Sequence, residues 1–229
     1  MDAKRNYNII GDIHGRTSWK ELVQDECINI FVGDYFDPYD AIPHELLLQN
    51  FKDILSYKTL HPESVLLYGN HDLHYLIDCE RASRFDRQYA ATYRQVFAES
   101  KELFHGVAYA IGGHTLVTHA GVTKQWYEKE FGEYHGATVE EVAEDINDLW
   151  SHNKLEFSFD LTTIFDFDGE SPTQSPLWIR PWSLLEHNLF IKTPFKQVFG
   201  HTQVEDITNL DEHLTCVDCL GTIAKSYEI

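Results

Sequence analysis

Positive charge is scarce in this chain of 229 residues. Lys and Arg number 18 against 37 Asp and Glu, which gives a formal net charge of -19 at pH 7. A field of this sign repels nucleic acids and anionic membrane surfaces, so we expect neither as a partner. A simpler explanation, that a strongly charged surface keeps the protein in solution, accounts for most of this net charge. A protein of this kind that handles phosphate must concentrate positive charge locally, through bound metal ions or a few arginines.

Long apolar runs are also missing. No stretch of the sequence approaches the roughly 20 apolar residues that are needed to cross a bilayer. The first residues, MDAKRNYNIIGD, pass directly into a strand pattern without the apolar segment of a signal peptide. We therefore expect a cytoplasmic protein with no membrane partner.

Cysteine is rare. The chain has four cysteines, and only Cys216 and Cys219 have the CxxC spacing. They lie in LTCVDCL (214–220), which has a strand pattern that would place the two sulfurs on opposite faces. Because there is no second CxxC, two small buried side chains are favoured over a structural zinc or redox site.

What the sequence does have is a regular alternation of strand and helix patterns. A length of 229 residues suits a single domain spanning 1–229. Short runs rich in β-branched and aromatic residues predict strands at 7–10, 28–32, 64–68, 114–118 and 196–199. Helical spacing at 19–26 and 44–57 separates the first three, which predicts a largely parallel first sheet with right-handed crossovers.

The second half of the chain predicts a second sheet. Residues 85–104 have the pattern of an amphipathic helix, and a hairpin follows that turns at Gly112 and Gly113. Strands at 196–199 and 214–220 would complete this sheet. Between them, 138–153 predicts a helix, and we expect 123–194 to form a lobe that selects the substrate. The aromatic residues of this lobe could stack on a nucleobase or fill a small core.

Five short motifs follow the predicted strands. They are GDIHG (11–15), GDYFD (33–37), GNHD (69–72), THAG (118–121) and GHT (200–202). Loops that leave the carboxyl ends of neighbouring strands converge on one rim of a sheet, and glycine allows sharp turns there. Polar residues that are distant in sequence can therefore share one cavity.

The polar residues of these motifs are metal ligands by type. Carboxylate, imidazole and amide oxygen come from Asp12, His14, Asp34, Asn70, His119 and His201. This mixture suits Mn, Fe or Zn and lacks the thiolates of a structural zinc site. Two ions roughly 3.5–4 Å apart can share a carboxylate and a hydroxide that attacks phosphorus. Asp34 is the natural bridging ligand, since it is the lone acid at the tip of the second strand.

The order of the motifs resembles the calcineurin-like metallophosphoesterase superfamily, and within it the serine/threonine phosphoprotein phosphatase branch. The resemblance runs over residues 11–201. It implies an α/β fold in which a two-sheet β sandwich is flanked by helices, in four αββα layers. It also implies one ion held by Asp12, His14 and Asp34, and a second held by Asp34, Asn70, His119 and His201.

The same resemblance assigns the catalytic groups. His71 would protonate the oxygen of the leaving group, and Asp37 would orient His71. Arg180, in SPLWIRP (175–181), lies where the family carries an arginine that binds phosphate. Asn70 would also contact the phosphate.

Two departures from the family pattern concern the substrate. The arginine of the family's DRG triplet is replaced by Pro38, which is followed by Tyr39, so one of two phosphate-binding arginines is missing. Arg16 is the nearby candidate to replace it. Eukaryotic protein phosphatases have Glu at the position of Asp72. An Asp here is more like the bacterial branches, which include the symmetrical diadenosine tetraphosphatases.

The sequence therefore predicts a metallophosphatase with two divalent ions, Mn being preferred and Fe or Zn being alternatives. Its substrate would be phosphorylated: a phosphoprotein, a small phosphate ester or a dinucleotide. Hydrolysis of monoesters through a metal-bridging hydroxide is the first reading. A symmetrical dinucleoside tetraphosphatase-like pyrophosphohydrolase is the second, and a non-catalytic metal-binding module is the third. The sequence leaves the oligomeric state open.

Overall fold

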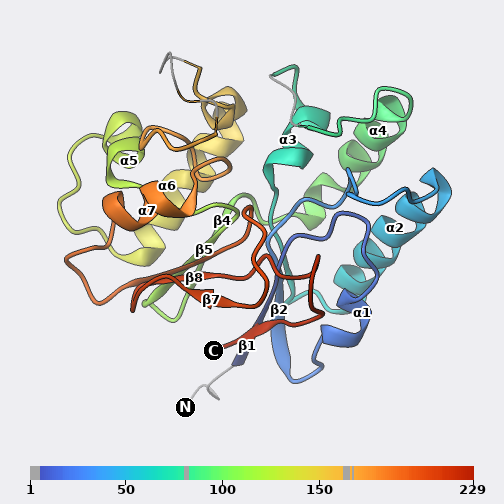
Figure 1. Ribbon diagram of the computed structural model, residues 1–229, viewed down its shortest axis with the longest axis horizontal. Helices are drawn as coiled ribbons and strands as arrows, with labels where there is room; N and C mark the ends of the chain where they lie inside the picture. Colours follow the sequence, from blue (N-terminus) through green and yellow to red (C-terminus); the bar gives the residue numbers. More distant parts are fainter. Residues whose placement is uncertain (1–5, 80–82, 162–165, 167) are drawn as a thin grey trace.

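The protein consists of two β-sheets packed face to face with helices outside them (Figure 1). The structure, a computed structural model, describes residues 6–79, 83–161, 166 and 168–229. The strand order is β3-β2-β1-β9 in the first sheet and β4-β5-β6-β8-β7 in the second. The predicted two-sheet sandwich flanked by helices is confirmed.

The first sheet is built mainly from the N-terminal third of the chain. Its strands are β1 (Asn6–Ile10), β2 (Cys27–Phe31), β3 (Val65–Leu66) and β9 (Tyr227–Glu228). The pairs β1–β2 and β2–β3 are parallel, as predicted, and β9 is antiparallel to β1. The crossovers contain α1 (Trp19–Leu22) and α2 (His44–Leu60). Helix α1 is shorter than the predicted 19–26 because the backbone is already extended at Val23.

The second sheet begins with the predicted hairpin. Its strands are β4 (Ala108–Ile111), β5 (Thr115–Thr118), β6 (Lys196–Phe199), β7 (Thr208–Asn209) and β8 (Leu214–Cys216). Strands β4 and β5 pair antiparallel, whereas β5–β6 and β6–β8 are parallel. The predicted strand at 214–220 is too long, since β8 ends at Cys216.

Further helices complete the outer layers. They are α3 (Asn70–Leu76), α4 (Ala90–Ser100), α5 (Lys124–Phe131), α6 (Val139–His152) and α7 (Pro181–His187), with the 3-10 helices η1 (Lys101–Leu103) and η2 (Lys154–Phe157). The predicted helix at 85–104 begins only at Ala90. Helix α6 begins where predicted, because Thr138 and Glu141 form a capping box.

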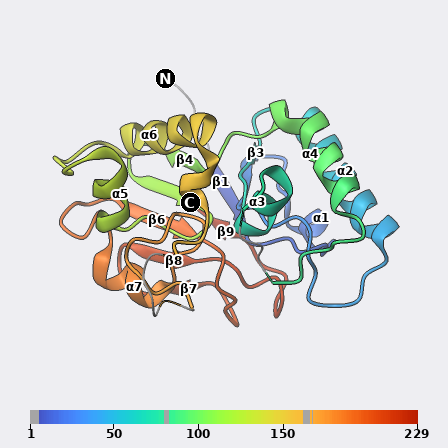
Figure 2. The ribbon, with the colours of Figure 1, turned by 90° about the horizontal axis from the view of Figure 1, so that it is seen from above.

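Side chains of each strand alternate between two apolar layers. Ile9 of the first sheet lies in one cluster with Val117 and Val198 of the second, so this cluster fills the space between the sheets. The next residue, Ile10, faces the other way and packs in a cluster with Phe51 of α2. Viewed from above, α2 and α4 lie beside the first sheet, and α5 and α6 lie at the opposite end of the molecule (Figure 2). Within the described residues, no helix combines the length and the apolar character of a membrane span.

The CxxC cysteines are small buried residues. Cys216 and Cys219 are both buried and unbonded to each other. Cys216 Sγ contacts the carbonyl oxygen of Thr202 at 3.3 Å. Neither cysteine belongs to a group of potential metal ligands in the described part of the chain.

Candidate metal centre and active site

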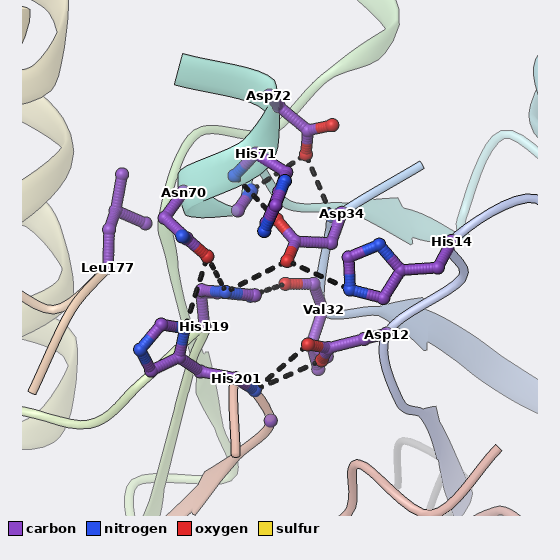
Figure 3. Close-up of polar contacts among 12 residues, drawn as sticks. Asp12, His14, Val32, Asp34, Asn70, His71, Asp72, His119, Leu177 and His201 are labelled. Atoms are coloured by element: carbon purple, nitrogen blue, oxygen red, sulfur yellow. Dashed lines mark hydrogen bonds and ion pairs between the residues drawn. The ribbon is translucent and has the colours of Figure 1, made fainter. Parts of the chain in front are cut away.

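All five motifs meet at the carboxyl ends of their strands. Asp12 and His14 follow β1, and Asp34 follows β2. Asn70 begins α3, just after β3, whereas His119 and His201 follow β5 and β6 of the other sheet. The predicted ligands lie together (Figure 3). The site is thus formed by both sheets.

The Asp34 carboxylate lies at the middle of this cluster. Its Oδ2 is 3.4 Å from His14 Nε2 and 3.6 Å from His119 Nε2. Asp34 also belongs to two groups whose ligand atoms could hold an ion, one with His14 and His71 and the other with Asp12 and His119. This placement agrees with a bridging carboxylate.

Asn70 joins the two histidines that come from the second sheet. Its Oδ1 is 2.8 Å from His119 Nε2 and 3.1 Å from His201 Nδ1. Its amide oxygen therefore faces the same space as the two imidazoles. These residues form the second predicted ligand set together with Asp34.

Two of the histidines are oriented by backbone carbonyls. His14 Nδ1 donates to the Phe36 carbonyl, and His119 Nδ1 donates to the Val32 carbonyl, both at 2.9 Å. A proton on Nδ1 leaves the Nε2 lone pair free toward Asp34. Ligating histidines characteristically have an outer hydrogen bond of this kind, because it fixes the tautomer and the ring plane.

Asp72 fixes the backbone around Asp34. Its carboxylate accepts hydrogen bonds from the backbone N–H groups of Asp34 (2.8 Å), Tyr35 (3.0 Å) and Gly69 (2.8 Å). A Cβ atom at Gly69 would collide with the Asp34 carboxylate, so only glycine allows this close approach.

The strained backbone of the molecule is concentrated here. Among the described residues, the non-glycine positions with positive φ are His14, Asp34, Asp37, Arg84 and His201. Such conformations cost free energy and persist where the surroundings enforce them, which is most often at functional sites. Four of these five are predicted site residues, and the fifth, Arg84, lines the same cavity.

Buried acids give the site an excess of negative charge. Burial, with the charges of Asp218 and Asp34, raises the pKa of Asp12 well above its ordinary value. Burial and the charge of Asp72 do the same to the pKa of Asp34. Burial lowers the pKa of His119 to about 3, so this imidazole is neutral and able to bind a cation. Divalent ions bound here would offset the repulsion between these carboxylates and stabilise their charged forms, so the donor set fits such ions.

A hydrogen-bonded group centred on Asp37 adjoins the ligands. Asp37 Oδ2 lies 2.9 Å from His71 Nδ1 and 2.8 Å from His74 Nε2. Its other oxygen accepts a hydrogen bond from the Tyr75 hydroxyl. The structure therefore brings together the predicted pair of Asp37 and His71.

The site opens into a cavity of about 320 Å³. Its lining residues are His14, Asp34, Tyr39, Asn70, His71, Ser83, Arg84, Trp178, Arg180, His201 and Gln203. Arg180 Nη1 lies 3.1 Å from Thr202 Oγ1, and Arg180 Nε donates to the Asp168 carbonyl. Arg180 is thus placed at the cavity as predicted. A cavity of about 600 Å³ next to Trp150 contains none of the predicted ligands.

Arg16 does not line this cavity. Its Nη1 points back to the carbonyl of Asp12 at 3.4 Å, and its charge lowers the pKa of the buried Asp218. Its guanidinium carbon lies 5.5 Å from the centre of the Tyr39 ring, and the expectation that Arg16 replaces the missing arginine stays a prediction. The guanidinium is directed toward the acids behind the ligands.

Sequence reasoning missed three residues near the site. His74 belongs to none of the five motifs, although its spacing of three from His71 places both on one face of a helix. The sequence predicts a strand through Asp218, but β8 ends two residues earlier and the Asp218 side chain is hydrogen-bonded to Asp12. Arg84 lies outside every motif, so no sequence signal could have identified it.

Comparisons with known proteins agree with this geometry. The sequence profile of the calcineurin-like phosphoesterases matches residues 7–205. The chain belongs to this family. Members typically bind two divalent ions, and the clusters of His and Asp around Asp34 could hold them. No curated protein sequence matches the chain.

Phosphatases are among the solved structures that share this fold. A cold-active protein-tyrosine phosphatase from a psychrophilic Shewanella species is 18% identical, with a TM-score of 0.61, over 97% of this chain and 73% of that one. A protein serine/threonine phosphatase from Saccharomyces cerevisiae is 17% identical, with a TM-score of 0.58, over 94% and 67% of the two chains. The family match makes this protein a phosphoesterase of the calcineurin-like type, and the solved structures show the fold that it shares with phosphatases.

Proposed function

We propose that this metallophosphatase hydrolyses phosphate monoesters with two divalent ions, for which Mn²⁺ is the preferred choice. The observation that carries the proposal is the position of His71. It lines the same cavity as the ligands Asp34 and Asn70, and it is hydrogen-bonded to Asp37 behind it. Residues that would hold water-activating ions therefore line the same cavity as a residue that can protonate a leaving oxygen.

The ions would be held by the predicted ligand sets around Asp34. When bound, they supply an activated water and stabilise charge on the transferring phosphoryl group. Asp12 and His14 would complete one set with Asp34. Asn70, His119 and His201 would complete the other.

His71 is placed to move a proton. Because its Nδ1 donates to Asp37, its Nε2 is left facing the cavity. Burial lowers the pKa of His71 from its ordinary value, and the hydrogen bond to Asp37 acts against this shift. Asp37 thus fixes the tautomer and favours the protonated form, which can give its proton to the departing oxygen.

Arg180 and Asn70 would orient the phosphate. Arg180 is half-buried at the cavity wall and, among the described residues, forms no ion pair with a carboxylate. Its charge is therefore available for phosphoryl oxygens, which a guanidinium binds in bidentate geometry. The amide of Asn70 would add a contact from the opposite sheet.

A dinucleoside tetraphosphate is the alternative substrate. Tyr39 and Trp178 line the cavity, and the Tyr39 side chain is 51% exposed. An exposed aromatic ring beside a phosphate site, such as that of Tyr39, could stack on a nucleobase. This observation favours a pyrophosphohydrolase similar to the symmetrical dinucleoside tetraphosphatases as the second candidate.

A non-catalytic metal-binding module is the least favoured reading. Such a module has no use for a leaving-group acid. Here His71 is retained with a buried carboxylate partner, Asp37, and with Tyr75 bonded to that partner. These contacts hold His71 in one orientation with its Nε2 toward the cavity, which suits proton transfer to a leaving oxygen.

The test is a substrate panel on Mn-reconstituted protein. A phosphoserine peptide, an aryl phosphate, an aryl phosphodiester and diadenosine tetraphosphate would be compared by release of phosphate or nucleotide. We expect the monoesters to be hydrolysed most efficiently. A preference for the dinucleotide would instead support the pyrophosphohydrolase. No measurable hydrolysis of any of the four substrates by protein with bound ions would favour the non-catalytic module.

Replacing His71 tests the acid. We expect His71→Ala to lower kcat by roughly two orders of magnitude or more on a poor leaving group such as phosphoserine. The loss on an activated aryl phosphate should be much smaller, because that oxygen leaves without protonation. His135→Ala, at an exposed histidine, is the control. Equal losses on both substrates would contradict the role of His71.

A further inference from the structure

The family's missing arginine leaves one side of the cavity without its usual cation, and another arginine fills that side. Arg84 lies in the segment between α3 and α4, far from the position of Pro38 in sequence. Its guanidinium lines the same cavity as Arg180. We propose that Arg84 is a phosphate-binding residue that takes the place of the arginine lost at Pro38. This inference rests on the proposed function.

Three contacts fix the guanidinium at the cavity. Arg84 Nε donates to the Asp37 carbonyl at 3.0 Å. The guanidinium carbon lies 3.7 Å from the centre of the Tyr39 ring, within the range of a cation–π contact. Asp37 and Tyr39 flank Pro38, so Arg84 reaches the loop from which the family's arginine would have come. The Tyr39 ring, next to Pro38, thus provides a stacking surface for this side chain.

The third contact places Arg84 beside the reacting groups. Arg84 Nη2 lies 3.3 Å from His71 Nε2, to which it can donate only while the imidazole is neutral. When His71 Nε2 carries the proton for the leaving oxygen, this N–H is released, and a guanidinium so close to that nitrogen is within reach of the phosphoryl group. Arg84 would therefore bind the phosphate on the side of the leaving group.

The charge of Arg84 is not neutralised by a carboxylate. Within the parts of the chain that the structure describes, Arg84 forms no ion pair with Asp or Glu, although acids outnumber bases about two to one. A half-buried arginine that lacks a carboxylate partner in so acidic a protein indicates an anionic ligand. Arg180 shares this property at the same cavity. Two such guanidiniums suit a dianionic monoester better than a monoanionic diester.

The backbone supports a specific role for this side chain. Arg84 has a φ of 63°, a left-handed conformation that non-glycine residues rarely adopt. Among the described residues it shares this property only with His14, Asp34, Asp37 and His201. The strain directs the side chain to the cavity where the ligands converge.

The experiment measures binding of inorganic phosphate to the Mn-loaded protein by calorimetry. We expect Arg84→Ala to weaken phosphate binding roughly 10- to 100-fold, since it removes a charge-assisted hydrogen bond. Arg84→Lys should lie between this variant and the wild type. Arg87→Ala is the matched control, because Arg87 is exposed in the same segment and does not line the cavity. It should bind phosphate within about twofold of the wild type.

A rescue variant sharpens the test. In the Arg84→Ala background, Pro38→Arg returns an arginine to the family's position and should recover part of the phosphate affinity. Metal content, measured by elemental analysis, should be unchanged in all of these variants. Loss of metal in Arg84→Ala would overturn the proposal, because the residue would then be needed to maintain the centre.

Two other results would also overturn it. The first is phosphate affinity in Arg84→Ala within twofold of the wild type. The second is a fall in kcat confined to the phosphoserine peptide, with unchanged phosphate affinity, which would make Arg84 a positioning residue for His71. Arg84-dependent phosphate binding by a protein that hydrolyses no ester would preserve this inference and refute the proposed function, so the two failures are distinguishable.

Discussion

At the scale of single residues, the site depends on one carboxylate. Asp34 Oδ2 lies near the Nε2 atoms of both His14 and His119, and Asp34 Oδ1 accepts a hydrogen bond from the backbone N–H of His71. Its neighbours thus come from three motifs and both sheets. No other described acid combines contacts of this kind, so Asp34 is where a single substitution should affect the centre most.

We expect Asp34→Asn to lose at least one metal ion. The substitution keeps the shape of the side chain but removes the negative charge that a bridging ligand needs. Metal content after Mn reconstitution, determined by elemental analysis, is the measurement. Asp148→Asn, at an exposed acid of α6, serves as the control and should keep full metal content. An Asp34→Asn protein with wild-type metal content would contradict the bridging assignment.

Sequence reasoning was most successful where a residue belongs to a motif next to a strand. All six predicted ligands, Asp37 and His71 meet in the structure because motif and strand end coincide. Arg84 could not be found, since its place depends on stacking over Tyr39 and not on a local pattern. Asp218 was hidden by a wrong strand boundary.

At the scale of elements, helix α3 organises the site. Its first residues, Asn70 and His71, enter the cavity, and Asp72 accepts hydrogen bonds from the loop that carries Asp34. One turn further, His74 and Tyr75 contact Asp37. The sequence did not predict this helix, because seven residues are too few for a clear periodic pattern. The helices α2 and α6 could be predicted because each is long enough to show a clear periodic pattern.

We expect Asp72→Asn to weaken metal binding by roughly 10- to 100-fold, the usual effect of losing an outer partner of a ligand. An amide cannot accept all three backbone N–H groups that the Asp72 carboxylate now accepts, so the loop holding Asp34 would lose its fixed conformation. Competition with a fluorescent chelator measures the affinity. Glu63→Gln, at an exposed acid, is the control. Unchanged affinity in Asp72→Asn would show that other contacts hold Asp34.

At the scale of the whole molecule, buried acids make the metal-free protein sensitive to pH. Burial raises the pKa of Asp72 to about 7 and that of Asp34 well above its ordinary range. Burial lowers the pKa of His119 to about 3 and lowers the pKa values of His14 and His201 as well, which opposes the effect of the acids up to about pH 7.5, where an unfolded histidine has lost nearly all of its protons. Above that pH the histidines are neutral whether folded or unfolded, so the acids alone determine the trend.

We therefore expect the metal-free protein to lose stability as the pH rises from about 7.5 to 8.5. An acid whose pKa is raised by folding binds more protons folded than unfolded in this range, so rising pH favours unfolding. Asp72 contributes only a small part of this decline in the free energy of unfolding, because its pKa of about 7 lies below this range. Urea denaturation of chelator-treated protein at both pH values is the measurement. Added Mn²⁺ should abolish the decline, and a rise in stability without metal would refute this account.

The predicted metal ligands come from both sheets, so bound ions would connect the sheets. Asp12, His14, Asp34 and Asn70 follow strands of one sheet, whereas His119 and His201 follow strands of the other. Bound ions would then cross-link the two halves of the sandwich at one end, much as a disulfide joins distant segments. Chelators used in purification would release that cross-link. Protection from hydrogen exchange should then fall first at the carboxyl ends of β2 and β5, long before the helices respond.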